Sequence, residues 1–218
     1  MVKFDIDSVM SILEDESKNW NVPVVTLIAI QEKDPFKVLI STILSLRTKD
    51  EVTIEASKRI YKILKSPEDI NKLSNKDIEK AIYPVGFYKR KTIVIRKICE
   101  RLIEEFESRV PCDLDTLLTF DGVGRKTANL VLSEGFQVPA MCVDVHVHRI
   151  SNRFGYIRTK DPEETEFRLR EKLPQKHWIK YNSLLVALGQ YICRPISPYC
   201  SKCPVNSYCK KVGVKKSR

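Results

Sequence analysis

The sequence predicts an all-α fold, and three observations lead to that prediction. Glycine is scarce, with 7 in 218 residues, whereas all-β proteins need many tight turns and usually contain more of it. Apolar residues recur at helical spacing directly after typical helix starts, and no convincing pair of alternating strands is present. Apolar residues make up 43% of the chain, so it can bury the core of one large domain or two small ones.

The expected helices begin at capping residues. Asp34-Pro35 and Asp161-Pro162 each place an N-cap before a proline at the first helical position, and Ser66-Pro67 opens a helix in the same way. Ser74 and Asp77 have the spacing of a capping box, with Asp in place of the usual Glu. A longer helix carries an apolar stripe formed by Ile95, Ile98, Cys99, Leu102 and Phe106. We interpret these stripes as core packing.

The charge balance favours an acidic partner. Lys and Arg total 38 against 28 Asp and Glu, a formal net charge of +10, and nucleic acid is the commonest partner of such a chain. A heat-adapted surface rich in Lys and Glu is the alternative. No apolar run reaches membrane-spanning length, and the first residues lack the apolar stretch of a signal peptide. We therefore expect an intracellular protein of the cytoplasm or nucleoid, with no membrane association.

Four of the seven cysteines crowd one segment with the spacing C-x6-C-x2-C-x5-C, namely Cys193, Cys200, Cys203 and Cys209. Four thiolates this close together can converge on one soft metal centre, and metal ligation is more common than disulfide formation in a reducing compartment. Four-cysteine zinc sites and [4Fe–4S] clusters both fit, and the spacing alone leaves the two open. We expect the remaining cysteines, Cys99, Cys112 and Cys142, to pack as small apolar residues.

Basic residues surround the cysteine segment. Arg194 and Lys202 lie within it and Lys210 and Lys211 follow it, so the segment could face phosphates or carry ordinary surface charge. Residues 210–218 form a basic tail, which we expect to be mobile and solvated.

Residues 113–134 have the pattern of two helices joined by a tight hairpin. Residues 113–119 form a short helix, residues 120–124 a turn, and residues 125–134 a second helix. The glycines at 122 and 124 allow a tight turn with exposed backbone N–H groups. Those donors and the positive start of the next helix suit a phosphate oxygen. A plain turn between two helices is the alternative.

Two polar residues near this hairpin are candidates for catalysis. Lys126 lies in the first turn of the second helix, where the positive helix end and partial burial would both disfavour a charged ammonium. A neutral lysine can attack a sugar C1′ and form a Schiff base. Asp144 is embedded in an apolar run, and a buried carboxylate needs partners or a purpose. Its alternative role is to cap a helix that begins near Val145. We expect His146 and His148 to make structural hydrogen bonds.

Three motifs in this order resemble the endonuclease III family: Gly122-Val-Gly-Arg-Lys126-Thr-Ala-Asn-Leu-Val-Leu, then Val143-Asp144-Val-His146-Val-His-Arg149-Ile-Ser-Asn-Arg153, then the four cysteines. The resemblance spans residues 30–209, and residues 85–88 also fit. It implies a two-lobed helix-hairpin-helix DNA glycosylase fold.

By this resemblance, residues 28–137 would form a six-helix barrel lobe that includes the helix-hairpin-helix at about residues 113–134. Residues 1–27 and 138–209 would form a second helical lobe with the cluster loop at 193–209. Double-stranded DNA carrying damaged bases or abasic sites would lie across the groove between the lobes. The resemblance also favours [4Fe–4S] over zinc, as a cluster that stabilises and positions a basic loop.

The resemblance implies a role for each site residue. Lys126 would be the nucleophile at C1′, and Asp144 would assist by handling a proton or stabilising positive charge at the sugar. The hairpin residues Gly122, Val123, Gly124 and Arg125 would contact DNA, together with Lys202. The enzyme would remove oxidised or saturated pyrimidines, which stack poorly, and nick the strand by β-elimination.

Four positions depart from the family pattern. Asp121 replaces an expected Pro in the hairpin and brings an acid close to the phosphate site, and Val145 replaces an expected Thr. Arg47 replaces a Gln that fills the hole left by the extruded base, and Arg could bond to the orphan base there. Phe87 replaces a Leu wedge and would stack between bases, or else serve as a core aromatic.

Two other functions remain open at this point. One is a mismatch glycosylase of the same superfamily, acting on T or U opposite G or on A opposite damaged G. Those relatives usually lack a lysine at the place of Lys126. The other is a zinc-stabilised DNA-binding module without catalysis, which would leave the embedded Asp144 unexplained. For the oligomeric state we expect a monomer.

Overall fold

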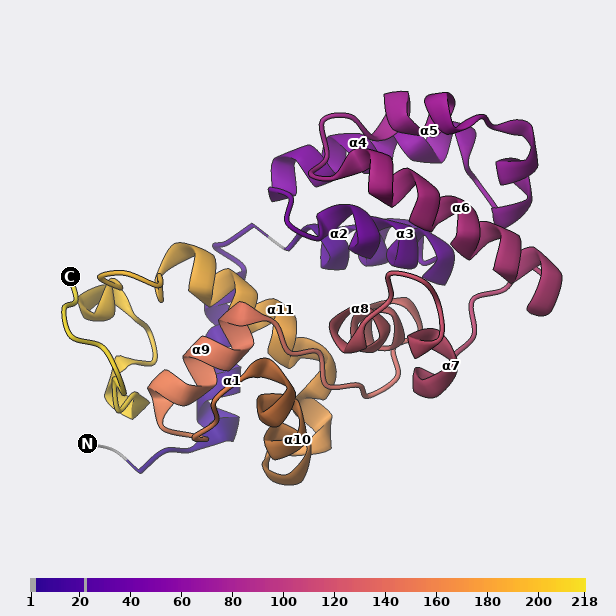
Figure 1. The fold of residues 1–218 in the computed structure, drawn as a ribbon. Helices are drawn as coiled ribbons and strands as arrows, with labels where there is room; N and C mark the ends of the chain where they lie inside the picture. Colours follow the sequence, from indigo (N-terminus) through magenta and orange to yellow (C-terminus); the bar gives the residue numbers. More distant parts are fainter. Residues whose placement is uncertain (1–2, 22) are drawn as a thin grey trace. The chain divides into compact units, whose positions relative to one another are not determined.

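The structure is a computed structural model that describes residues 3–21 and 23–218 (Figure 1). Within these residues every regular element is a helix and there is no β-strand, so the all-α prediction is confirmed. The chain divides into two compact units, one of residues Val24–Val138 and one of Met1–Pro23 with Pro139–Arg218. Residues 1, 2 and 22, which the sequence assigned to the second lobe, lie outside the described residues.

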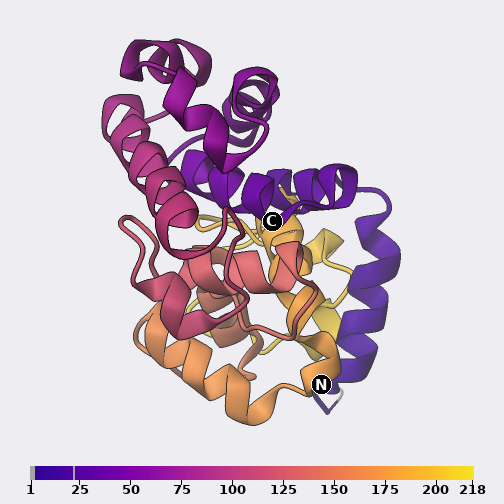
Figure 2. The same ribbon diagram turned by 90° about the vertical axis from the view of Figure 1, so that its right-hand side faces the viewer.

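The Val24–Val138 unit is built around α3 (Pro35–Ser45), eight of whose eleven residues are buried. Its other helices are α2 (Val24–Glu32), α4 (Asp50–Ile63), α5 (Asn75–Ile82), α6 (Tyr88–Glu105), α7 (Leu114–Leu118) and α8 (Arg125–Leu130). α3 packs against α2, α4, α6 and α8 (Figure 2). The predicted start of α3 is confirmed, because the side chain of Asp34 accepts a hydrogen bond of 2.9 Å from the N–H of Phe36.

Most of the predicted capping residues do lie at helix starts in the structure. The box of Ser74 and Asp77 is present at the start of α5. Ser66-Pro67 does open a helix, but it is the six-residue 3₁₀ helix Pro67–Lys72. The next cap at Ser74 requires extended backbone there, with a ψ of 162°. The Pro67–Lys72 helix ends before this cap, and the N–H of Leu73 donates to Ile70 O at 3.2 Å, an i→i+3 bond typical of a 3₁₀ helix.

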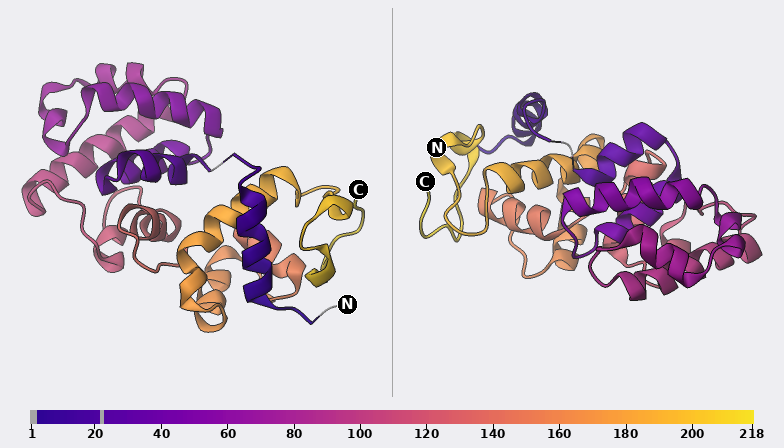
Figure 3. Two further views of the ribbon diagram at one scale, coloured as in Figure 1. Left: turned by 180° about the vertical axis from the view of Figure 1, so that it is seen from behind. Right: turned by 90° about the horizontal axis from the view of Figure 1, so that it is seen from above.

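The second unit places α11 (Trp178–Tyr191) between α1 (Ile6–Ser17) and α9 (Val145–Phe154), and α10 (Pro162–Lys172) packs on α9 (Figure 3). The shared core is apolar and includes Val147 and Ile150. Tyr181 is fully buried in it, and its hydroxyl is satisfied by Ser151 Oγ at 2.9 Å. Cys193, Cys203 and Cys209 pack against the same core.

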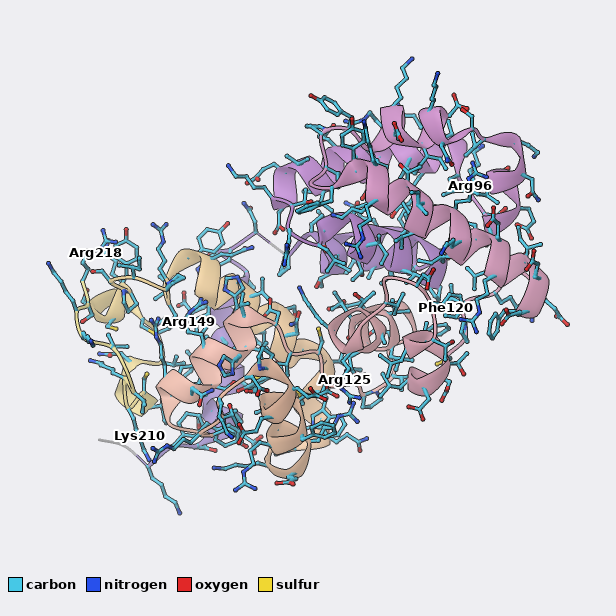
Figure 4. The ribbon with its side chains drawn as sticks, viewed as in Figure 1. Arg96, Phe120, Arg125, Arg149, Lys210 and Arg218 are labelled. Carbon is cyan, nitrogen blue, oxygen red and sulfur yellow. The ribbon has the colours of Figure 1, made fainter. Side chains whose placement is uncertain are left out.

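The basic tail is held by backbone hydrogen bonds, so the prediction of a mobile tail is wrong. The N–H of Lys210 donates to Phe154 O at 3.3 Å and that of Val212 to Arg153 O at 3.0 Å. The N–H of Arg218 donates to Pro198 O at 2.8 Å, and Figure 4 labels Lys210 and Arg218 in this part of the chain. The lysine side chains remain exposed. The composition of the tail shows its positive charges, but it does not show that the backbone of the tail makes hydrogen bonds with distant residues.

None of the helices in the described ranges is long and apolar enough to cross a membrane.

One buried acid lies where α8 continues as a single π-helical turn, Val131–Gly135. Glu134 is 7% exposed, and its carboxyl accepts a hydrogen bond of 2.9 Å from Thr26 Oγ1. Burial raises the pKa of Glu134 to about 7, and the bond from Thr26 opposes that rise. This carboxyl therefore changes charge near neutral pH, unlike an exposed glutamate.

Replacing Glu134 by glutamine should flatten the pH dependence of stability. The folded pKa lies above the ordinary 4.5, so the neutral carboxyl stabilises the fold fully below pH 4.5, and that contribution is lost as the pH rises through 7. The loss amounts to at most about 3 kcal/mol. Urea unfolding at pH 5 and pH 8 measures the effect. Between these two pH values the free energy of unfolding should fall more in the native chain than in Glu134→Gln. Parallel profiles for the two proteins would contradict this.

Candidate functional site

The hairpin between α7 and α8 requires glycine at one position and tolerates other residues at another. Gly122 has a φ of +75°, and a Cβ there would meet Val94 Cγ1 at 2.8 Å. Gly124 has an ordinary φ of −98°, and a Cβ there would meet nothing within 4 Å. The fold therefore explains Gly122, whereas among the described residues nothing near Gly124 calls for glycine at that position.

Side chains of α6 anchor this hairpin. The guanidinium of Arg101 donates to Thr119 O at 2.8 Å and lies 4.5 Å from the ring centre of Phe120. The ammonium of Lys97 pairs with Asp121 at 2.7 Å, and this hydrogen bond lowers the pKa of Asp121. The acid that departs from the family pattern is thus paired with a lysine, which offsets part of its negative charge.

Lys126 is the second residue of α8 and is half-buried. The two residues that follow it, Thr127 and Ala128, are buried and fix this turn of helix in the unit. Figure 4 labels Arg125, which precedes Lys126 at the start of α8. The structure therefore places the lysine in the first helical turn after the hairpin, as the sequence predicts.

Asp144 is the N-cap of α9 and is 9% exposed. One carboxylate oxygen, Oδ1, accepts hydrogen bonds from the N–H of His146 at 2.8 Å and of Val147 at 2.9 Å. The capping role that the sequence left open is confirmed. Since both bonds use Oδ1, neither of them engages Oδ2.

The two histidines make the hydrogen bonds that we expected. His146 Nδ1 lies 3.0 Å from the guanidinium of Arg149, and His148 Nδ1 lies 2.7 Å from Thr165 Oγ1.

Arg47 and Phe87 come from two loops that touch. Arg47 is exposed and has a φ of +53°, and Phe87 is 62% exposed with a φ of +58°. The guanidinium carbon of Arg47 lies 5.8 Å from the ring centre of Phe87. Exposure excludes the core alternative for Phe87. A Cβ on Gly86 would meet the carbonyl oxygen of Arg47 at 2.7 Å, so the backbones approach as closely as only glycine permits.

Lys91 lies beneath these loops and was not among the functional residues predicted from the sequence. It is 6% exposed, and its ammonium donates to Leu44 O, Leu46 O and Thr48 Oγ1 at 2.8, 2.6 and 3.2 Å. Burial lowers the pKa of Lys91 to about 8. The available signal was its place four residues before Ile95, on the apolar stripe of α6.

The four cysteines line one small cavity of about 20 Å³ beside α9 and α11. The guanidinium of Arg153 donates to Cys193 Sγ at 3.4 Å and the N–H of Lys211 to Cys209 Sγ at 3.3 Å. Among residues 3–21 and 23–218, no three His, Cys, Asp or Glu side chains lie close enough together to hold one metal ion. Lys202 is exposed on the short turn Cys200–Lys202.

Four thiols are a donor set that both a zinc ion and an iron–sulfur cluster accept. Thiolates on one tetrahedral zinc lie about 3.8 Å apart, as Zn–S bonds of about 2.3 Å require. A [4Fe–4S] cube binds each thiolate to a different iron, so its four ligands line a common cavity at wider separations. N–H donors aimed at the sulfurs, such as those of Arg153 and Lys211, are common around such clusters.

A family model described as "HhH-GPD superfamily base excision DNA repair protein" matches residues 40–175, which is more than half of the chain. The chain belongs to this superfamily. It is also similar to endonuclease III of Thermotoga maritima, with 45% identity over 180 residues, which cover 83% of this chain and 84% of that protein. The family resemblance is therefore confirmed.

Solved structures of the superfamily give the same result. A non-covalent endonuclease III–DNA complex has a TM-score of 0.80 at 32% identity, and covers 94% of this chain and 95% of that one. A trapped endonuclease III–DNA covalent intermediate has a TM-score of 0.78 at 30% identity, with the same coverage. The helix-hairpin-helix glycosylase fold predicted from the sequence is confirmed. The chain is a base excision repair enzyme, a DNA glycosylase and lyase.

Alanine at the two hairpin glycines should separate folding from DNA binding. Gly122→Ala should lower the free energy of unfolding by about 3 kcal/mol, because it combines a left-handed φ with a clash against Val94. Gly124→Ala should change that free energy by less than about 1 kcal/mol and should weaken duplex DNA binding roughly tenfold by blocking the open backbone. Urea unfolding and a fluorescence anisotropy titration measure the two effects. Native DNA affinity in Gly124→Ala would show that the turn is only a connection.

Proposed function

We propose that this glycosylase removes oxidised or saturated pyrimidines from duplex DNA and nicks the strand 3′ to the abasic site by β-elimination through a lysine Schiff base. The observation that carries the proposal is Lys126, a half-buried amine in the first turn of α8 after the hairpin. An amine nucleophile makes a glycosylase bifunctional, because the imine it forms permits strand cleavage. The similar endonuclease III trapped as a covalent DNA intermediate supports this chemistry.

Lys126 would act through its uncharged amine. The nitrogen bonds to C1′ of the extruded nucleotide, and the C1′–N bond to the base breaks with its electron pair leaving on the base. Opening of the sugar ring gives a protonated imine, which acidifies the 2′ hydrogens. Loss of one of them expels the 3′ phosphate and nicks the strand. Water then releases the lysine from the imine.

Asp144 would assist this sequence at the sugar. Its Oδ1 is held by two backbone N–H groups, which fix the carboxylate in position. Oδ2 would then stabilise the positive charge that develops at the sugar, or carry a proton between steps. Because Asp144 is 9% exposed, such an interaction would be screened less by water than one at the surface.

The remaining DNA contacts are proposed from position and charge. Gly122, Val123, Gly124 and Arg125 would bind a phosphate at the hairpin, and the exposed Lys202 would bind a second one. Arg47 would fill the space left by the extruded nucleotide, and Phe87 would stack between neighbouring bases. Oxidised or saturated pyrimidines stack poorly, so extruding them costs less free energy than extruding a normal base.

We propose that Cys193, Cys200, Cys203 and Cys209 hold a [4Fe–4S] cluster. When bound, the cluster would supply no redox step in base removal and would tie down the segment that carries Lys202. The rival zinc site predicts a colourless protein, whereas an iron–sulfur protein is brown with broad absorption near about 400 nm. We also propose that the enzyme acts as a monomer on intracellular DNA.

A mismatch glycosylase of the same superfamily is the remaining alternative for the substrate. Such relatives usually lack a lysine at the position of Lys126, so its presence favours the bifunctional enzyme. Duplexes with thymine glycol, with T opposite G and with A opposite damaged G, scored separately for base release and for nicking, distinguish the two.

Lys126→Ala should abolish covalent trapping. With borohydride and a thymine-glycol or abasic duplex, the native enzyme should cross-link to DNA. Lys126→Ala should not, and its nicking should fall by at least about 10³-fold, because no imine forms. Lys160→Ala is the matched control, since Lys160 is an exposed lysine outside the proposed site. Normal trapping by Lys126→Ala would assign the nucleophile to another amine.

Asp144→Asn should separate catalysis from capping. Asparagine caps helices as well as aspartate does, so the thermal midpoint should change little while base release slows by at least about 10²-fold. Asp144→Ala should also destabilise the protein by about 1 kcal/mol through loss of the cap. Gel-based single-turnover assays and thermal melts measure both. Unchanged base release in Asp144→Asn would reduce Asp144 to a structural cap.

A further inference from the structure

We infer that Lys91 is a positioning residue that holds Arg47 and Phe87 as one fixed pair for insertion into DNA. The inference rests on the DNA role proposed for these two side chains. Lys91 itself lies too deep to meet DNA, because it is 6% exposed. It would act only through the two loops that it joins.

The ammonium of Lys91 closes the end of α3. It donates to Leu44 O at 2.8 Å and to Leu46 O at 2.6 Å, and these carbonyls lie where α3 ends and the chain turns out toward Arg47. A helix end leaves carbonyls without helical partners, and a cation is favourable there. The third donor reaches Thr48 Oγ1 at 3.2 Å. The acceptors therefore lie on both sides of Arg47.

The same lysine belongs to the loop of Phe87. Lys91 lies in the first turn of α6, and its own N–H donates to the carbonyl oxygen of Phe87 at 3.0 Å. Thr48 Oγ1 also accepts a hydrogen bond of 3.2 Å from the N–H of Gly86. Lys91 and Thr48 thus link the backbone on each side of Arg47 to the backbone on each side of Phe87.

Both residues of the pair need such support. Arg47 and Phe87 have φ values of +53° and +58°, a region that residues other than glycine avoid unless the surrounding structure imposes it. Both side chains are exposed, so their own packing cannot supply that constraint. The cross-links beneath them can, and they fix the direction in which the guanidinium and the ring leave the surface.

A packing role alone would not call for a lysine. The position lies on the apolar stripe of α6, where methionine would fill similar volume without the cost of burying a charge. What lysine adds is three N–H donors in a tetrahedral arrangement, and their acceptors are one carbonyl at the end of α3 and two groups in the loop of Arg47. The three acceptors around its ammonium therefore explain why a charged lysine is buried at position 91.

The test uses Lys91→Met, with Lys76→Met on the exposed face of α5 as a control. In the DNA-free holoenzyme, Lys91→Met should speed amide hydrogen exchange in residues 46–49 and 85–88 at least about tenfold, with residues 95–105 unchanged. Single-turnover base release from a thymine-glycol duplex should slow about tenfold. Lys91→Gln keeps two donors, so its exchange rates and its rate of base release should lie between those of the native protein and Lys91→Met. It replaces the methionine variant if that variant fails to fold.

A double-mutant cycle shows whether Lys91 acts through the pair. In an Arg47→Ala/Phe87→Ala background, Lys91→Met should slow base release no further. An equal additional loss there, with the double variant itself slowed, would overturn the positioning role and leave the proposed DNA role standing. Native base release and DNA affinity in Arg47→Ala/Phe87→Ala would overturn the DNA role itself. Unchanged hydrogen exchange in Lys91→Met would overturn the positioning role whatever the DNA assays give.

Discussion

Two backbone N–H groups at the start of α9 share one carboxylate oxygen of Asp144, and much of the second unit depends on the helix that they open. α9 packs on α10 and α11 and buries Val147 and Ile150 in their shared core. Farther along, Arg149 donates to the carbonyl oxygen of Cys193 at 3.0 Å and Arg153 to that of Arg194 at 2.7 Å. The same helix therefore begins at the proposed catalytic carboxylate and contacts the cysteine segment through Arg149, labelled in Figure 4, and through Arg153.

The Val24–Val138 unit positions its functional side chains in a different way. Lys126 follows a hairpin whose turn is held by one obligatory glycine, Gly122, and by Arg101 and Lys97 of α6. These contacts support the turn at the place where the family pattern has a proline. In both units a proposed catalytic residue lies at or next to the first turn of a helix. The backbone N–H groups there have no partner within the helix, and the positive end of the helix dipole lies there.

The sequence predicts features that depend on neighbours along the chain. The caps at Asp34, Asp144 and Asp161 all form, because a cap needs only the next two or three N–H groups. The hairpin and the order of the three family motifs are local patterns of the same kind. Gly122 was identified as a turn residue, although the reason for it, the side chain of Val94, belongs to another helix.

Features that depend on tertiary contacts were missed or wrong. Lys91 and Glu134 are buried, but composition treats every lysine and glutamate as a surface charge. The tail at 210–218 has a disordered composition, yet its backbone pairs with residues 153, 154, 198 and 201. The burial of these side chains and the pairing of the tail depend on parts of the chain that are distant in sequence.

In the proposed mechanism, the amine of Lys126 bonds to the deoxyribose of the damaged nucleotide. The most direct measurement is mass spectrometry of the borohydride-reduced enzyme–DNA adduct after digestion with nuclease and protease. We expect the residual sugar mass on the peptide that contains Lys126, on its Nζ. A sugar adduct on any other lysine or on an N-terminal amine, with Lys126 unmodified, would contradict it.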